Sequence, residues 1–193
     1  SDAWNQWLEQ GLPGQPGTDD PYIAAKQAFT WLLGTPGAAM VFQGDEYGEY
    51  GGGDPDNRHL LRGPTTWSDS ESDLSAFFAG LGMLRDELTP LRRGSYTSLE
   101  SDNNTIAWAR QTADESAIVV MNRGYTDHDF QFDLNSLAGE WDEDHPDHFG
   151  GTNLTNGFVR LPGQSIGIFS NGFFVEPGNG TGNGTDPGGN GTD

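Results

Sequence analysis

Hydrophobic residues recur at helical spacing in two segments of the chain. The first segment carries them at Ile23, Ala24, Ala28, Trp31 and Leu32. Asp19 or Asp20 can cap a helix there and Pro21 suits its first turn, so we expect a helix over residues 21–33. A second helix is expected over residues 74–88, where apolar residues fall near one face and Pro90 follows as a stop.

Between the two helices, residues 38–42 form a short apolar run. Glycine and proline precede it, and Gly44, Asp45 and Glu46 come directly after it. A run of this length and setting is typical of a strand buried in a parallel sheet. The helix, the turn and the strand would form half of an α/β unit, in which ligand sites cluster at the carboxyl ends of the strands.

After Arg92 the pattern changes to short strands separated by turns. We expect strands over residues 95–99, 105–110, 117–121, 129–132, 158–161 and 165–169. Most of them are about ten to twelve residues apart, which is typical of an antiparallel β-sandwich. Phe130 and Phe132 share one face of their strand and are expected to fill its core. The predicted fold class is therefore α/β followed by all-β.

The two ends of the chain show no core-forming pattern. Residues 1–20 are rich in glycine, proline, aspartate and glutamine, which predicts a long loop. From Glu176 onward the sequence is dominated by glycine, asparagine, threonine and aspartate. Such a composition predicts a flexible tail, or a linker to a further domain beyond it.

Charge and composition exclude several classes of protein. The 193 residues include 29 acidic and 9 basic side chains, which gives a net charge of −20. Such a surface repels phosphate backbones and anionic lipids, so we expect neither nucleic acid nor a membrane as a partner. The absence of cysteine excludes disulfides, thiolate zinc sites and cysteine nucleophiles. The acidity suits a protein kept soluble in brine, or an ordinary acidic secreted protein.

Residues 28–62 read AFTWLLGTPGAAMVFQGDEYGEYGGGDPDNRHLLR. This segment resembles the last barrel segment of the alpha-amylase superfamily, family 13 of the glycoside hydrolases. In that family a helix leads through a Thr-Pro-Gly turn into the eighth strand, which ends in Gly-Asp-Glu and is often followed by a Gly-Gly-x-Asp-Pro-Asp-Asn-Arg loop. Residues 74–88 are similar to the closing barrel helix, and residues 92–175 to the all-β domain that follows it.

The resemblance implies the C-terminal fragment of a secreted, retaining glycoside hydrolase that acts on α-glucans such as starch and maltooligosaccharides. Residues 1–90 would be the end of a (β/α)₈ barrel, residues 91–175 a C-terminal β-sandwich, and residues 176–193 a linker. The family's catalytic carboxyl groups lie on earlier strands, one of them in a His-Asp motif, and no histidine precedes His59. We therefore expect no catalytic residue in this chain and no activity from it alone.

Two alternatives remain open at this point. The first is an α-glucan transglycosylase of the same family, because the choice depends on strands that this chain does not contain. The second is a stand-alone carbohydrate-binding module over residues 92–175, which a coplanar row of exposed aromatic residues would favour. The candidates for that row are Trp108, Phe130, Phe132, Trp141 and Phe149.

The glycine-rich loop over residues 51–58 is the strongest candidate for substrate contact. Carboxylates and amides bind sugar hydroxyls, and aromatic faces stack on sugar rings. We expect Tyr47, Asp54, Asn57 and Arg58 to contact the glucan, the alternative being turn caps and an ion pair of Arg58. A calcium loop would need an oxygen ligand where Arg58 stands. No cofactor is therefore expected in this chain, although the parent enzyme could bind calcium.

Gly44, Asp45 and Glu46 are expected to be structural. Neighbouring residues at a strand end point in different directions, so Asp45 and Glu46 make a poor pair of acid and nucleophile. A hydrogen bond or ion pair that fixes the loop suits them better. Residues 142–148 place two histidines among four carboxylates. We expect a solvated acidic loop there in preference to a metal site.

Overall fold

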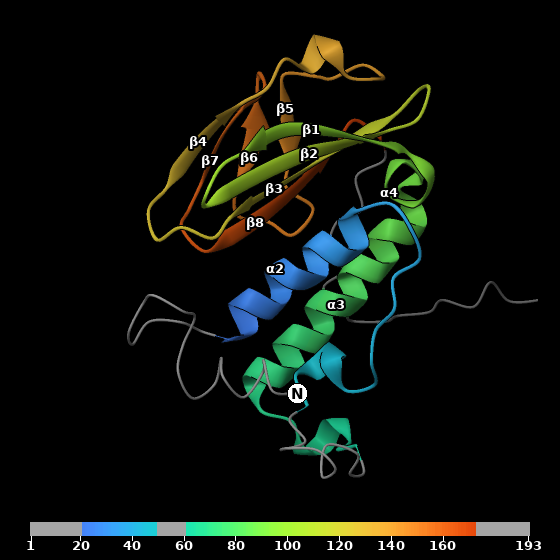
Figure 1. Cartoon of the computed structure of the whole chain (residues 1–193), viewed down its shortest axis with the longest axis vertical. Coiled ribbons are helices and arrows are strands. Elements are labelled where there is room, and N and C mark those ends of the chain that lie inside the picture. The colour runs from blue at the N-terminus through green and yellow to red at the C-terminus, as the bar shows by residue number, and fades with distance from the viewer. Residues whose placement is uncertain (1–20, 50–60, 173–193) are drawn as a thin grey trace, which may run out of the picture.

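The computed structural model describes residues 21–49 and 61–172, in which helices lie against one face of a β-sandwich (Figure 1). The helices are α2 (Pro21–Gly34), α3 (Asp69–Glu87) and the short α4 (Thr89–Arg93). Two 3-10 turns, η1 (Asp45–Tyr47) and η3 (Pro64–Thr66), lie between α2 and α3 along the chain. In these ranges no helix is long and apolar enough to cross a membrane. The predicted loop over residues 1–20 and the predicted tail lie outside the described residues.

The sandwich consists of two four-stranded sheets in which every paired strand is antiparallel. The first has the order β1-β2-β3-β8, with β1 (Ser95–Ser101), β2 (Thr105–Gln111), β3 (Ser116–Asn122) and β8 (Ser165–Ser170). The second has the order β4-β7-β6-β5, with β4 (His128–Gln131), β5 (Asp144–Pro146), β6 (Asn153–Thr155) and β7 (Phe158–Leu161). The six predicted strands are confirmed. The sequence pattern predicts neither β5 nor β6, because three residues are too few to show an alternation.

Strands β2 and β3 of the first sheet are buried on both faces, because alternate residues enter two different cores, whereas the edge strand β1 is largely exposed. Trp108 of β2 and Val119 of β3 enter a core shared with the helices, where they join Leu74 and other apolar residues of α2 and α3. Ile118 of β3 enters a second core, between the sheets, that also holds Phe130. Burial on both faces explains the near-continuous apolar run of β3. The helices and the sandwich are therefore packed around a common sheet.

Side chains from the sheet and from α3 satisfy the carbonyl groups at the end of α2. The last carbonyls of a helix have no partner within it, and cations are favoured there. Trp108 Nε1 and Arg110 Nη1 both donate to the carbonyl of Gly34, at 3.0 and 2.9 Å. Arg85 of α3 donates to the carbonyls of Leu33 and Thr35. These contacts link the end of α2 to the sheet and to α3.

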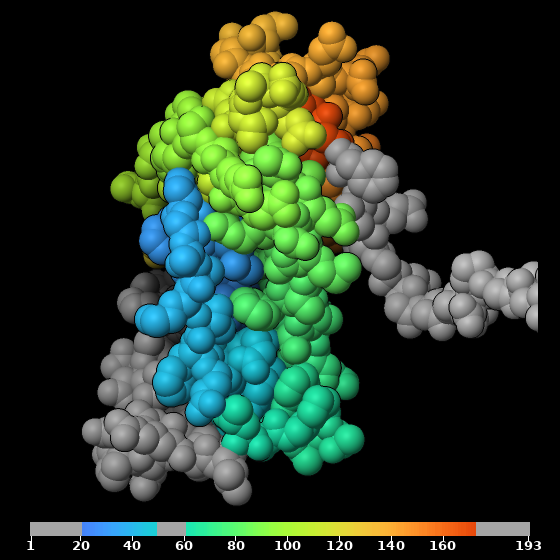
Figure 2. Space-filling view, turned by 90° about the vertical axis from the view of Figure 1, so that its right-hand side faces the viewer, coloured from blue at the N-terminus to red at the C-terminus, as the bar shows by residue number. Residues whose placement is uncertain are grey.

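The predicted strand over residues 38–42 is wrong for this structure. The segment has no regular secondary structure, and Met40 and Phe42 are 90% and 63% exposed. A strand needs a neighbouring strand to accept its hydrogen bonds, and this segment pairs with no strand of the two described sheets. Figure 2 shows the segment after α2 running over the outside of the molecule. Met40 and Phe42 therefore lie on the surface, whereas Ala39 and Val41 are partly buried against the core that the sheet shares with the helices.

Candidate functional site

The Gly-Asp-Glu motif forms a tight turn around η1. Gly44 and Gly48 flank this turn in the left-handed region, with φ of 95° and 76°. An L-residue rarely adopts such angles, and a Cβ added at Gly44 would lie 2.7 Å from Glu49 Cβ. Backbone bonds close the turn, among them the one from Glu49 N to Gly44 O at 2.8 Å. Glycine at position 44 is therefore required by the geometry of the turn.

The carboxylates of Asp45 and Glu46 bind the backbone of their own turn. Asp45 Oδ2 accepts from Phe42 N at 3.2 Å, and Glu46 Oε2 accepts from Gly44 N at 2.8 Å. These contacts agree with the expectation that a hydrogen bond fixes the loop. The two carboxylates bind different backbone groups. An ion pair of either residue with an arginine is not found within the described part of the chain.

Arg62 clamps this turn to the start of α3. Its Nε donates to both oxygens of Glu49, at 2.9 and 3.2 Å, and its terminal nitrogens donate to both oxygens of Glu71. Glu71 Oε2 also accepts from Ser68 N at 2.6 Å, which completes a capping box at the N-terminus of α3. Glu49 and Arg62 flank the segment that contains the predicted substrate loop. The ion pair therefore joins the two ends of that loop.

Tyr47 lies beneath this clamp. Its side chain is 2% exposed, its ring stacks on that of Trp67 with centroids 4.3 Å apart, and its hydroxyl accepts from Arg62 N at 3.2 Å. The Arg62 guanidinium lies 5.8 Å from the ring centroid. In these contacts Tyr47 packs against Trp67 and Arg62. The predicted contact of Tyr47 with a sugar stays a prediction.

Burial and charge set the pKa values of the clamp. Burial alone would raise the pKa of Glu49, but hydrogen bonds from Tyr47 and Arg62 outweigh it and hold the pKa below its usual value. For Glu71 the same balance holds, because hydrogen bonds from Arg62 and Ser68 outweigh its burial and lower its pKa. Burial and the contact with Glu49 raise the pKa of Tyr47 to about 12. Both carboxylates are therefore charged at neutral pH, and the phenol is neutral.

The other predicted contact residues, Asp54, Asn57 and Arg58, lie outside the described residues, so their contact with a glucan stays a prediction. Sequence reasoning missed Arg62, Glu49 and Glu71 as the residues that hold the loop ends. One signal was available, because Ser68-x-x-Glu71 before an apolar run is the pattern of a capping box. The partners of Arg62 had no comparable signal, since they depend on how the chain returns to α3.

The prediction of a solvated acidic loop over residues 142–148 is wrong in part. Residues 144–146 form β5, and His145, Asp147 and His148 are buried. His145 Nδ1 lies 3.1 Å from Ser170 O, and Asp147 Oδ1 accepts from Ile168 N at 2.9 Å. These bonds tie the segment to β8, which is why it is buried. The described residues contain no group of three histidine or carboxylate side chains able to hold a metal ion.

The aromatic residues considered for a binding row do not form one. Trp108, Phe130 and Phe132 are buried in the two cores, so the core prediction for Phe130 and Phe132 is confirmed. Trp141 and Phe149 are partly buried and pack against different cores.

Comparison with known proteins relates this chain to amylolytic enzymes. It is 32% identical over 110 residues to an amylopullulanase of Thermoanaerobacter thermohydrosulfuricus, covering 51% of this chain and 7% of that protein. It is 36% identical over 94 residues to neopullulanase 2 of Thermoactinomyces vulgaris, covering 47% of this chain and 15% of that protein. The alpha-amylase of Geobacillus thermoleovorans has a TM-score of 0.66 and 23% identity over 79% of this chain and 34% of its own. No family model matches the sequence.

These matches show a relationship to the alpha-amylase family of glycoside hydrolases over a C-terminal region of those enzymes. The two antiparallel sheets and few helices agree with the C-terminal β-sandwich domain that such enzymes carry. The chain spans only a small part of the relatives named above, between 7% and 15% of the two curated proteins and 34% of the amylase structure.

Proposed function

We propose that this chain is the C-terminal part of an alpha-amylase-type retaining glycoside hydrolase that acts on α-glucans, and that it carries no catalytic carboxyl group. The relatives are an amylopullulanase and a neopullulanase, whose names place their activity on α-glucans. Retaining hydrolysis needs two carboxyl groups about 5–5.5 Å apart, with one free to attack and one free to protonate. Asp45 and Glu46 are instead bound to the backbone of their own turn.

The observation that carries this proposal is the exposed apolar segment between α2 and η1. Met40 and Phe42 lie largely in solvent, although the neighbouring strands β2 and β3 are buried on both faces. Apolar side chains this exposed mark a surface that another structural element covers. In the proposal, residues 38–42 become the eighth barrel strand when the preceding strands are present to pair with them.

The same proposal divides the chain as the sequence predicts. Residues 1–90 end the barrel, residues 91–175 form the C-terminal sandwich, and residues 176–193 form a flexible linker or tail. The clamp of Arg62 on Glu49 and Glu71 would hold the loop that bears Asp54, Asn57 and Arg58 at the rim of the glucan cleft. The parent enzyme would work outside the cell, because polymeric starch does not enter it.

Two alternative functions are supported to different degrees. A transglycosylase of the same family would use the same C-terminal part, and only the products of the parent enzyme distinguish it. A stand-alone binding module over residues 92–175 is less well supported, because the sheet β1-β2-β3-β8 shares a core with α2 and α3. Removing the helices would expose one whole face of that sheet.

The test is to express the whole open reading frame that contains this chain, beside the chain alone, and to measure the reducing ends released from soluble starch. We expect release by the whole product and none by residues 1–193. Hydrolysis by the chain alone, or a whole product that cleaves no α-glucan, would overturn the proposal. Transfer of sugar units to an added acceptor would favour the transglycosylase.

A further inference from the structure

A groove of about 680 Å³ lies where the two long helices meet the sandwich. Helices α2 and α3 line one side of it, and the segment after β5 and the start of β8 line the other (Figure 1). Most of its surface is apolar, and Met83, which is 61% exposed, lies along it. The groove contains none of the residues that were predicted to contact a glucan.

Two phenylalanine rings form the aromatic part of the groove. Phe77 of α3 and Phe149 of the sandwich contact each other, with ring centroids 4.7 Å apart. Gly80 permits this approach, because a Cβ there would lie 3.2 Å from Phe149 Cε1. Ala76 and Ala79 have small side chains and leave the groove open along α3. An apolar body of moderate size therefore finds a preformed surface to contact.

Asp147 is the only buried residue among those that line the groove, with 3% exposure. Its Oδ1 accepts from Ile168 N at 2.9 Å and from Phe149 N at 3.2 Å. Within the described parts of the chain, Oδ2 has no hydrogen-bond partner and the carboxylate has no ion pair. Buried carboxylates are usually paired with a cation, because burial of an unpaired charge is costly. Asp147 therefore lacks a positive partner.

The basic residues of the chain do not supply this partner. Lys26 lines the groove, but it pairs with Asp73 at 2.5 Å and lies 5.3 Å from the centre of the Phe77 ring. The segments outside the described residues contain one arginine, Arg58, and no lysine. Arg58 belongs to the loop that we expect at the glucan cleft. This leaves a cation from outside the chain as the partner of Asp147.

We propose that the groove binds a small organic cation, whose ammonium or guanidinium group donates to Asp147 Oδ2 while its apolar body packs against Phe77 and Phe149. The faces of these two rings attract positive charge, which adds to the effect of the carboxylate. An anionic ligand would be repelled by Asp73 and Asp147. The site takes no part in bond cleavage, and it does not depend on the proposed function.

The test is isothermal titration calorimetry of the 193-residue chain with 4-phenylbutylamine, beside the neutral 4-phenylbutanol and the anionic 4-phenylbutyrate. Burial raises the pKa of Asp147 to about 6, so the titrations are made at pH 8, where the carboxylate is charged. Molar sodium chloride screens the acidic surface of the chain. We expect saturable binding of the amine, and binding of the alcohol and the acid about tenfold weaker or less, because neither supplies a charged donor.

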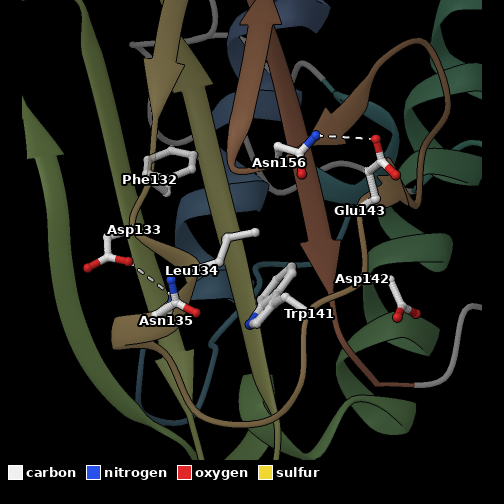
Figure 3. A pocket seen from close by; sticks show the side chains of 8 residues that line it. All are labelled: Phe132, Asp133, Leu134, Asn135, Trp141, Asp142, Glu143 and Asn156. Atoms are coloured by element: carbon white, nitrogen blue, oxygen red, sulfur yellow. Dashed lines mark hydrogen bonds between the residues drawn. The ribbon is translucent and has the colours of Figure 1, made fainter.

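Two variants probe the two parts of the site. Asp147→Asn removes the charge but keeps an acceptor for the backbone, and should weaken binding of the amine about tenfold or more. Its control is Glu143→Gln, since Glu143 is paired with Asn156 in a separate, polar hollow of the sandwich (Figure 3). Ala76→Leu should block the groove and leave Asp147 in place. Its control is Ala28→Leu, because Ala28 is exposed on α2 and does not line the groove.

Unfolding midpoints in urea show that each variant is folded. No saturable binding of the amine, or binding that neither Asp147→Asn nor Ala76→Leu weakens, would overturn the site. Equal weakening by Asp147→Asn and Glu143→Gln would also overturn it, because the amine would then be attracted by the acidic surface as a whole. Binding of the alcohol as tight as that of the amine would contradict the cation. None of these results touches the proposed function, which the whole open reading frame tests.

Discussion

The indole of Trp108 donates a hydrogen bond to the carbonyl of Gly34 at 3.0 Å, across 74 positions of the sequence. Arg110, two residues further along β2, donates to the same carbonyl at 2.9 Å and to the carbonyl of Gly94 at 2.8 Å. These bonds lie beside the core that the sheet shares with α2 and α3. The helices and the sandwich are therefore expected to unfold together, in one transition.

Replacing Arg110 tests this connection. Arg110 is 1% exposed, and Arg110→Met would leave the carbonyls of Gly34 and Gly94 without their charged donors. We expect a loss of about 2–4 kcal/mol in the free energy of unfolding, measured by urea titration. Arg160→Met is the control, because the Arg160–Asp129 ion pair is exposed to solvent and should contribute little to stability. Equal effects of the two variants would show that the buried contacts do not hold the parts together.

Two glycines in the helices provide a matched pair of substitutions. A Cβ at Gly34 would lie 2.9 Å from Cζ2 of the Trp108 ring, which is buried and cannot rotate away. A Cβ at Gly82 would meet nothing within 4 Å. We expect Gly34→Ala to destabilise by about 1–3 kcal/mol through overpacking. Gly82→Ala should stabilise by up to about 1 kcal/mol, because alanine favours a helix interior. Thermal unfolding followed by circular dichroism measures both, and a stable Gly34→Ala would contradict the described contact.

The clamp of Arg62 should make stability depend on pH in the acid range. The pKa values of Glu49 and Glu71 are lowered in the folded state, so their contribution is present above the unfolded pKa of about 4.3 and is lost as the pH falls through the folded values. We expect Arg62→Met to lose about 1–3 kcal/mol at pH 7 and much less near pH 2. Urea titrations at several pH values measure this. A loss that is the same at every pH would contradict the ion pairs.

Asp147 should make the stability of the fold depend on pH in the opposite direction. Burial raises its pKa to about 6, although Ile168 N and Phe149 N donate to it. Because the folded pKa lies above the unfolded pKa of about 3.9, the stability it contributes is present at low pH and is lost as the pH rises from about 4 to about 6. An asparagine oxygen can accept the same bonds without charge. We expect Asp147→Asn to raise stability at pH 7 and to remove this part of the pH dependence. A loss of stability at pH 7 would contradict it.

Elements with a long period or a clear alternation could be predicted from the sequence, and elements defined by distant partners could not. The helix over residues 21–33 and the strand pattern around Phe130 and Phe132 are confirmed, because local spacing alone specifies them. Residues 38–42 have the composition of a buried strand, but a strand also needs an edge to pair with. His145 belongs to a segment that looks solvated in sequence, yet its contact with Ser170 draws that segment inward.

The candidate site also has a part that could be predicted from the sequence and a part that could not. The Gly44 turn and the separate directions of Asp45 and Glu46 follow from local geometry. The clamp follows from the return of the chain to α3, which no spacing in the sequence reveals.

The most direct measurement of the central claim is the anomeric configuration of the sugars released from a maltooligosaccharide, followed by proton NMR. Expressed from its whole open reading frame, the protein is expected to release the α-anomer first, as a retaining enzyme of this family does, while the 193-residue chain releases no sugar. Release of the β-anomer first would contradict the retaining mechanism. Release of any sugar by the 193-residue chain would contradict the claim that its role is structural and substrate-binding.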